Sequence, residues 1–161
     1  LNMKKQLSYK LAAAGVIGAL YAGLTYLFAF SSFTANQLRV AEALTLMPML
    51  IPQASAGLAV GCFLANLISG YGVADLIVGP LATLLAAVCT RRLRDKFWLA
   101  ALMPVLFNGV IVGSVVHFCY STAIALPLCM LSVAAGEAVA CLVVGPLLIS
   151  VLRRMPASVL N

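Results

Sequence analysis

The chain has 161 residues, of which 64% are hydrophobic and 9% are charged, and its formal net charge is +6. A mean hydropathy of +1.12 excludes an ordinary soluble domain, which needs much more polar surface. Long uncharged runs at 11–37, 97–136 and 138–152 are candidates for helices that cross a bilayer, and none alternates as a membrane β-barrel does. The sequence therefore predicts an all-α membrane protein built as one integral domain, residues 1–161.

The first predicted helix covers residues 7–30. Lys4 and Lys5 precede its apolar run, so a cleaved secretory signal is the alternative interpretation. The run is long and lacks a clear small-x-small cleavage site before a polar region, which favours a helix that is retained in the membrane.

Small residues recur on this first helix at a spacing of four. They form two adjacent rows, Ala14, Gly18 and Ala22 and then Gly15, Ala19 and Gly23. Such rows let helix backbones approach closely in lipid. We expect one row to pack inside the bundle, but two rows make a face wider than one neighbour needs. The second row could therefore serve a partner protein.

Basic residues set the predicted topology. Nine of the ten Lys and Arg residues lie before the first helix or in its first turn, in the segment 91–96 or after the last helix, and Arg39 is the exception. Loops rich in Lys and Arg stay cytoplasmic, so an even number of crossings must separate the N-terminus from 91–96. The sequence thus predicts a six transmembrane helix bundle with both termini cytoplasmic, at residues 7–30, 33–51, 53–69, 73–90, 97–120 and 125–152.

Two details follow from this topology. The second and third helices are short for a crossing, so we expect tilt or breaks there, with an inside turn marked by Pro48 and Pro52. The positive net charge needs no nucleic acid as a partner, because cytoplasmic anchors and anionic lipid headgroups of the bilayer account for it.

An opposite charge pair stands near the predicted outer end of the second helix. Arg39 and Glu42 are three residues apart and so share one helical face. One interpretation is a self-contained ion pair, with Arg39 reaching to the headgroups. The other is a polar wall of a ligand pocket, and the position of the two residues does not choose between them.

Five more polar residues fall in the outer half or the middle of the predicted spans: Asn66, Asp75, Asn108, His117 and Glu137. Each has a plainer explanation: Asp75 can cap its helix, the asparagines can join helices, and His117 can sit at the interface. Glu137 is the hardest to explain so, because a carboxylate at mid-depth costs a few kcal/mol (about 2 to 4) unless it is paired or protonated. The one-sided clustering predicts a site that opens outward.

Known catalytic and metal-binding patterns do not occur in the sequence. A single histidine and scattered carboxylates match no metal-ligand spacing, and the five cysteines form no CxxC and resemble small apolar residues. We expect no cofactor, and any ATP hydrolysis must occur on another chain, because no Walker A motif is present. Ser114 and His117, three residues apart, offer only a weak case for an intramembrane enzyme.

The segments QLRVAEALTLMP (37–48) and IPQASAGLAVGCFLANLISGYGVADLIVGPLATLLAAVCTRRLR (51–94) resemble the QueT family, and the rest of the chain resembles it in layout. These proteins are substrate-binding S components of energy-coupling factor (ECF) transporters. The resemblance implies six helices, in the plasma membrane of a bacterium, that bind one small molecule near the outer face. It also implies that small residues of the first helix dock onto a transmembrane coupling protein carried by two ATPase subunits, and that the S component topples to release its cargo.

The cargo that the resemblance implies is a queuosine precursor, a 7-deazaguanine with a cyano or aminomethyl group, or queuine. An S component for a different vitamin or nitrogenous base is the alternative. A deazaguanine offers two N–H donors on one edge, which a carboxylate accepts as a pair, so Glu42 and Glu137 are the best candidates, and a second carboxylate could meet an aminomethyl cation. Arg39 or an asparagine could donate to O6. Aromatic residues of the outer loops could cover the ring: Phe33, Tyr71 and Tyr120.

Overall fold

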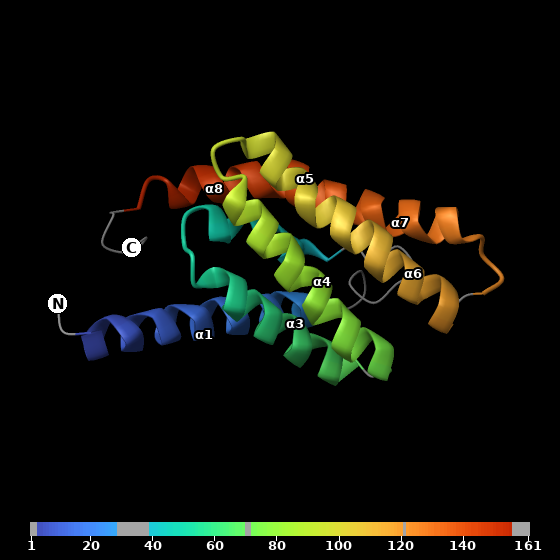
Figure 1. Ribbon diagram of the computed structural model, residues 1–161, viewed down its shortest axis with the longest axis horizontal. Helices are drawn as coiled ribbons and strands as arrows, with labels where there is room; N and C mark the ends of the chain where they lie inside the picture. Colours follow the sequence, from blue (N-terminus) through green and yellow to red (C-terminus); the bar gives the residue numbers. More distant parts are fainter. Residues whose placement is uncertain (1–2, 29–38, 70–71, 121, 156–161) are drawn as a thin grey trace.

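Helices account for all regular secondary structure in the part of the chain that the computed structural model describes, residues 3–28, 39–69, 72–120 and 122–155. The first four are α1 (Met3–Leu27), the 3-10 helix η1 (Val40–Met49), α3 (Ala54–Ser69) and α4 (Val73–Arg92) (Figure 1). A fifth runs through α5 (Phe97–Phe107), the π-helix η2 (Asn108–Val112), α6 (Gly113–Val115) and the π-helix η3 (Val116–Tyr120). The sixth runs through α7 (Leu126–Ala138), the π-helix η4 (Val139–Val144) and α8 (Gly145–Leu152).

These helices confirm the predicted all-α class and the number of six. Four of them are long and apolar enough to cross a membrane: Met3–Leu27, Val73–Arg92, Phe97–Tyr120 and Leu126–Leu152. The protein is therefore a multi-pass membrane protein. The first helix begins earlier than predicted and ends at Leu27, and the fourth continues to Arg92.

The second helix differs most from the prediction of an α-helix at 33–51. Its described part is a 3-10 helix of 10 residues, in which nine consecutive residues, 41–49, are buried. Such long 3-10 runs are uncommon. In this one, Thr45 donates its hydroxyl hydrogen to the carbonyl oxygen of Glu42 at 2.5 Å. Pro48 also lies inside the helix and lacks an N–H group. The segment is thus a buried central element, and its 10 residues are too few to cross lipid as an α-helix.

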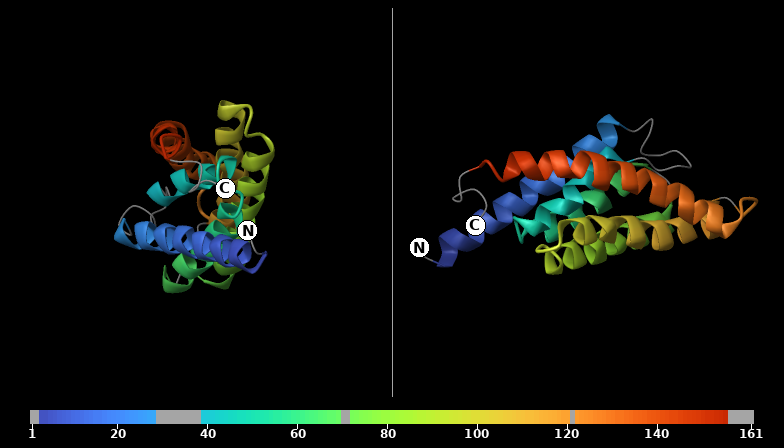
Figure 2. Two further views of the ribbon diagram at one scale, coloured as in Figure 1. Left: turned by 90° about the vertical axis from the view of Figure 1, so that its left-hand side faces the viewer. Right: turned by 90° about the horizontal axis from the view of Figure 1, so that it is seen from above.

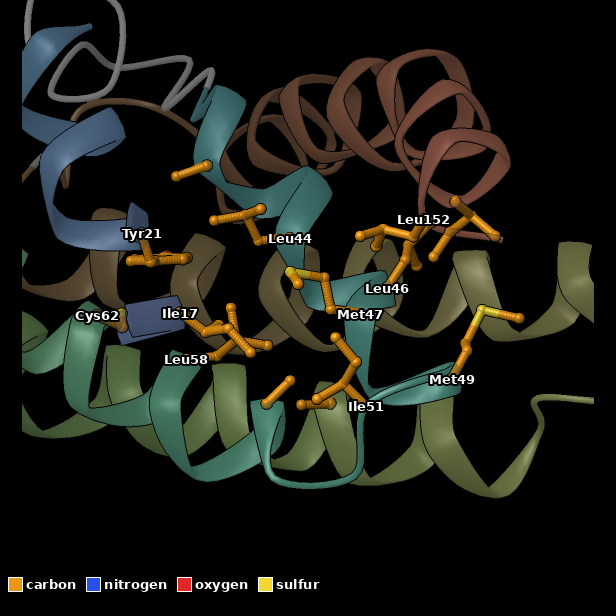
Figure 3. Packing of buried hydrophobic residues seen from close by; sticks show 14 of the residues in the cluster. Ile17, Tyr21, Leu44, Leu46, Met47, Met49, Ile51, Leu58, Cys62 and Leu152 are labelled. Carbon is orange, nitrogen blue, oxygen red and sulfur yellow. The ribbon is translucent and has the colours of Figure 1, made fainter. Parts of the chain in front are cut away.

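Residues of η1 form the centre of the main hydrophobic core. Figure 3 shows side chains of η1 between those of α1, α3 and α8, with Leu46 fully buried. The labelled members include Ile17, Tyr21, Leu58 and Leu152. The other helices surround η1, and its residues 41–49 are therefore buried in protein instead of facing lipid.

Glycines allow close contact between α1 and α3. A side chain at Gly18 would come within 2.7 Å of the carbonyl oxygen of Gly57, and Gly61 lies against the same turn of α1. The row Ala14, Gly18 and Ala22 therefore faces the bundle, as expected for one of the two rows.

One end of the bundle collects the start of α1, the turn between α4 and α5 and the end of α8 (Figures 1 and 2). Lys10, Arg91 and Arg94 line a common pocket there with Pro52 and Gln53. The turn between η1 and α3 thus lies at the basic end, where the prolines predicted it.

Candidate functional site

Six of the seven predicted polar residues are buried in the middle of the bundle. The exposed fractions are 5% for Arg39, 2% for Glu42, 3% for Asn66, 2% for Asp75, 2% for Asn108 and 4% for Glu137. They come from η1 and its N-cap, α3, α4, η2 and α7. With three further side chains that contact them they form what we call the polar cluster: Tyr21, Arg39, Glu42, Cys62, Asn66, Asp75, Asn108, Glu137 and Cys141.

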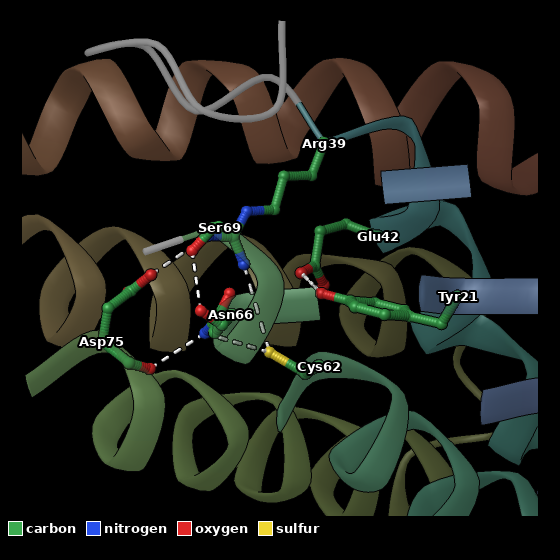
Figure 4. A network of polar contacts seen from close by, with 7 residues as sticks. All are labelled: Tyr21, Arg39, Glu42, Cys62, Asn66, Ser69 and Asp75. Atoms are coloured by element: carbon green, nitrogen blue, oxygen red, sulfur yellow. Dashed lines mark hydrogen bonds and ion pairs between the residues drawn. The ribbon is translucent and has the colours of Figure 1, made fainter. Parts of the chain in front are cut away.

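Arg39 joins η1 to α4. Its Nη2 atom lies 3.4 Å from Oδ2 of Asp75, and its Nη1 atom lies 4.0 Å from Sγ of Cys62 (Figure 4). Arg39 is therefore held inside the protein, and the interpretation in which it reaches out to the headgroups is wrong. Asp75 lies in the first turn of α4, where the helix dipole favours a carboxylate, but its side chain also forms this ion pair between elements.

Asn66 connects α3 to α4 on the same side of the cluster. Its Nδ2 atom donates to the carbonyl oxygen of Asp75 at 2.8 Å and lies 3.7 Å from Sγ of Cys62. This approach requires Gly79, because a Cβ there would lie 2.5 Å from Nδ2. The side-chain oxygen of Asn66 is buried and has no hydrogen-bond partner within the described ranges. An N–H donor of a ligand would satisfy it.

Glu42 is held by donors from two other helices. The hydroxyl of Tyr21 donates to Oε1, and Nδ2 of Asn108 lies 3.4 Å from Oε2 (Figure 4 shows the first contact). Tyr21 is fully buried and was not predicted. A tyrosine in the middle of an apolar helix is a usable signal, because its buried hydroxyl needs a partner. The carboxylate can accept further donors besides these two, because its two oxygens together offer about four lone-pair sites.

Glu137 is buried on α7, one turn before Cys141 of the same long helix. Sγ of Cys141 lies 3.9 Å from Oε2 of Glu137 and 3.5 Å from the carbonyl oxygen of Glu42. Cys62 and Cys141 thus contact polar groups, whereas the cysteine pattern in the sequence indicated only small apolar residues. Asn108 begins η2, and Glu137 stands just before η4, so both lie where π-turns interrupt an α-helix, a feature often found at functional sites.

The cluster has an uneven charge. It contains three of the four acidic residues of the chain, Glu42, Asp75 and Glu137, and one basic residue, Arg39. The formal excess is two negative charges. Because buried charge without a partner is costly in lipid, this excess calls for a cationic group or for protons.

His117 lies elsewhere. Its Nδ1 atom is 2.7 Å from the carbonyl oxygen of Ile124, across the turn that precedes α7. Ser114 donates its hydroxyl hydrogen to the carbonyl of Val110 at 2.6 Å, so the described contacts do not join it to His117 as a nucleophile and base. Tyr120 is 38% exposed and its hydroxyl would lie 3.3 Å from a Cβ at Gly72. The predictions for Phe33 and Tyr71 lie outside the described residues.

The second small-residue row of α1 is open. Gly15, Ala19 and Gly23 are exposed, and a Cβ at Gly15 or Gly23 would have no described atom within 4 Å. Two shallow hollows of about 370 and 380 Å³ lie along this face. The rows therefore differ as expected: one is occupied by α3 and the other is uncovered.

The described residues hold no group of three or more His, Cys, Asp or Glu side chains that could bind a metal ion. Neither a curated protein nor a solved structure matches the chain. Residues 11–154 match the family described as QueT transporter, which is a transporter family and not an enzyme family. The match covers most of the chain and confirms the resemblance noted in its sequence, so the chain belongs to the QueT transporter family.

Proposed function

We propose that this protein is the S component of an ECF importer and that its cargo is a cationic queuosine precursor, a 7-aminomethyl-7-deazaguanine. Membership of the QueT transporter family implies a small queuosine precursor as substrate. The observation that supports this cargo is the buried polar cluster, which holds three carboxylates and one guanidinium.

The hydrogen-bonding groups of the deazaguanine ring match those of the polar cluster. One carboxylate, Glu42 or Glu137, accepts the N1–H and 2-amino donors as a bidentate pair. The unpartnered oxygen of Asn66 can accept a further N–H, and Arg39 can donate to O6. Sites whose buried polar groups are satisfied only by the right ligand reject analogues that lack those groups.

The aminomethyl group compensates part of the excess negative charge of the polar cluster. It is protonated at neutral pH, and the second carboxylate is its natural partner. A cyano group at the same position is neutral and leaves that carboxylate without a counter-charge. The same argument makes a cationic vitamin the best alternative cargo and speaks against an anionic one.

The open row Gly15, Ala19 and Gly23 supports docking of α1 onto a transmembrane coupling protein. In this proposal two ATPase subunits bound to that protein supply the energy, and the chain lies in a bacterial plasma membrane as a single domain. The basic end with both termini faces the cytoplasm, and the polar cluster is reached from the outer side.

Binding measurements test the cargo. The protein is purified in detergent, and its affinities for the aminomethyl and the cyano deazaguanine are measured by calorimetry, with mass spectrometry of any co-purified small molecule. We expect at least about tenfold tighter binding of the aminomethyl compound, since a charge-assisted hydrogen bond contributes about 1.5 to 3 kcal/mol. Equal affinities would overturn the charge argument, and binding of neither compound would overturn the assignment to queuosine precursors.

A further inference from the structure

A second charged site lies at the opposite, basic end of the bundle. A pocket of about 500 Å³, here called the basic pocket, is lined by Lys10, Leu50, Pro52, Gln53, Arg91 and Arg94. Its three cations come from α1, from the end of α4 and from the turn after α4, so they are far apart in the sequence. All three are exposed, and none forms an ion pair with a carboxylate among the described residues.

General membrane anchoring explains some of this charge. Basic residues gather at the cytoplasmic ends of membrane helices, and Arg91 in the last turn of α4 is favoured by the helix dipole. Anchoring alone does not require cations from two helices to line one hollow. Arg153 and Arg154, which are exposed at the end of the last helix and do not line the pocket, show what a plain anchor looks like here.

The lining also supplies neutral donors. Gln53 lines the pocket, and its side-chain nitrogen is buried without a hydrogen-bond partner in the part of the chain that is described. α3 begins at the next residue, Ala54, so the positive end of a 16-residue helix adjoins the pocket. Three cations, an amide and a helix N-terminus together suit a ligand with several acceptor oxygens and negative charge, and arginine forks match phosphate oxygens in particular.

We propose that the basic pocket binds a phosphate group and that the headgroup of an anionic phospholipid supplies it. An apolar groove of about 360 Å³ begins beside the pocket, since Tyr9 and Ile51, which line the groove, are chain neighbours of Lys10, Leu50 and Pro52. The groove continues along α1 and the end of α8, where its lining includes Ile17, Leu20 and Leu152. A free phosphate needs only the pocket, whereas a lipid uses the pocket and the groove.

Such a lipid would fasten α1 to the rest of the bundle. Only 22% of the most apolar 18-residue stretch of α1 is buried, and α1 packs mainly on α3 and η1. A headgroup held by Lys10 on one side and by Arg91 and Arg94 on the other bridges α1 and α4. Binding to the folded state therefore stabilises the protein, and the stabilisation increases with the concentration of the anionic lipid.

The test uses the full chain in nanodiscs of phosphatidylcholine, with or without about one-fifth phosphatidylglycerol. We expect the anionic lipid to raise the thermal midpoint of the wild type by on the order of 5 °C. The pair Arg91→Gln with Arg94→Gln should lose most of that rise. The matched pair Arg153→Gln with Arg154→Gln removes the same charge outside the pocket and should keep it. Equal losses in both pairs, or no loss in the first, would overturn the proposal.

Two further arms cover the remaining outcomes. Millimolar inorganic phosphate added to the phosphatidylcholine discs should leave the midpoint unchanged, and a rise equal to that from the lipid would assign the pocket to a soluble phosphate instead. If the double variant does not fold, Lys10→Gln is compared with Lys5→Gln, which removes a charge from α1 away from the pocket. Native mass spectrometry should then show fewer bound anionic lipids on Lys10→Gln only, and equal numbers on both variants would contradict the pocket.

Discussion

The polar cluster and the basic end use charge in opposite ways. In the cluster three carboxylates and one guanidinium are almost fully buried, and Arg39, Glu42 and Asp75 are held by side chains from other elements. At the basic end the cations are exposed, and Asp95, the one acidic residue outside the cluster, is exposed as well. Burial makes every charge dependent on its partners, whereas water and headgroups accept charge at a membrane surface without a specific partner. Single substitutions should therefore matter in the cluster, and at the basic end they should matter hardly at all outside the basic pocket.

The largest effect should follow Arg39→Gln, because it leaves Asp75 buried without its cation. Removing one member of a buried pair costs about 3 to 5 kcal/mol. Thermal unfolding in detergent measures the loss. Adding Asp75→Asn to the same chain should recover part of it, and a double variant as unstable as the single one would show that the ion pair is not the cause.

Glu137→Gln should weaken cargo binding by about 10- to 100-fold, because it removes a carboxylate but keeps the shape of the side chain. Calorimetry with the aminomethyl deazaguanine measures the change, and the thermal midpoint serves as the control for folding. Affinity equal to that of the wild type would remove Glu137 from the site.

The two rows on α1 offer a contrast on a single helix. Gly18→Ala puts a methyl group against the carbonyl of Gly57 and should destabilise the fold by about 1 to 3 kcal/mol. Gly15→Leu enters open space, so it should leave the thermal midpoint in place and reduce co-purification with the coupling protein. Unchanged co-purification of Gly15→Leu would mean that docking uses another face.

Tyr21→Phe should cost about 1.5 kcal/mol, because it removes only the hydroxyl that donates to Glu42 and leaves the ring in the core. The thermal midpoint and the affinity for cargo should both fall slightly. A gain in affinity would indicate instead that cargo competes with Tyr21 for this carboxylate.

The smallest effect should follow Asp95→Asn at the basic end. The same substitution at Asp75 breaks an ion pair in the cluster, whereas Asp95 is exposed. We expect a thermal midpoint equal to that of the wild type for Asp95→Asn and a clear decrease for Asp75→Asn. Similar decreases in both variants would contradict the distinction between the two regions.

Much of the fold and of the polar cluster could be predicted from the sequence, because lipid excludes charged side chains and requires helices with long apolar runs. Uncharged runs predicted the all-α class, the positions of the basic residues predicted six helices, and the small residues of α1 predicted one packed row and one open row. Six of the seven predicted polar residues lie in one buried cluster. Tyr21 was missed although a tyrosine inside an apolar helix signals a buried hydroxyl, and Cys62 and Cys141 were missed because nothing in their local sequence shows which helix faces them.

The amino-acid sequence by itself determined where the chain prefers lipid, where it carries positive charge and which charges have no place in lipid. These properties depend on the transfer of each side chain from water and need no partner. Only the tertiary structure decided that Arg39 pairs with Asp75 rather than leaving the bundle, that η1 is a short 3-10 helix at its centre, and that His117 contacts Ile124 instead of the cluster. The physical reason is that a buried polar group takes its partner from whichever helix lies opposite, and that neighbour is set by packing between segments that are distant in the chain.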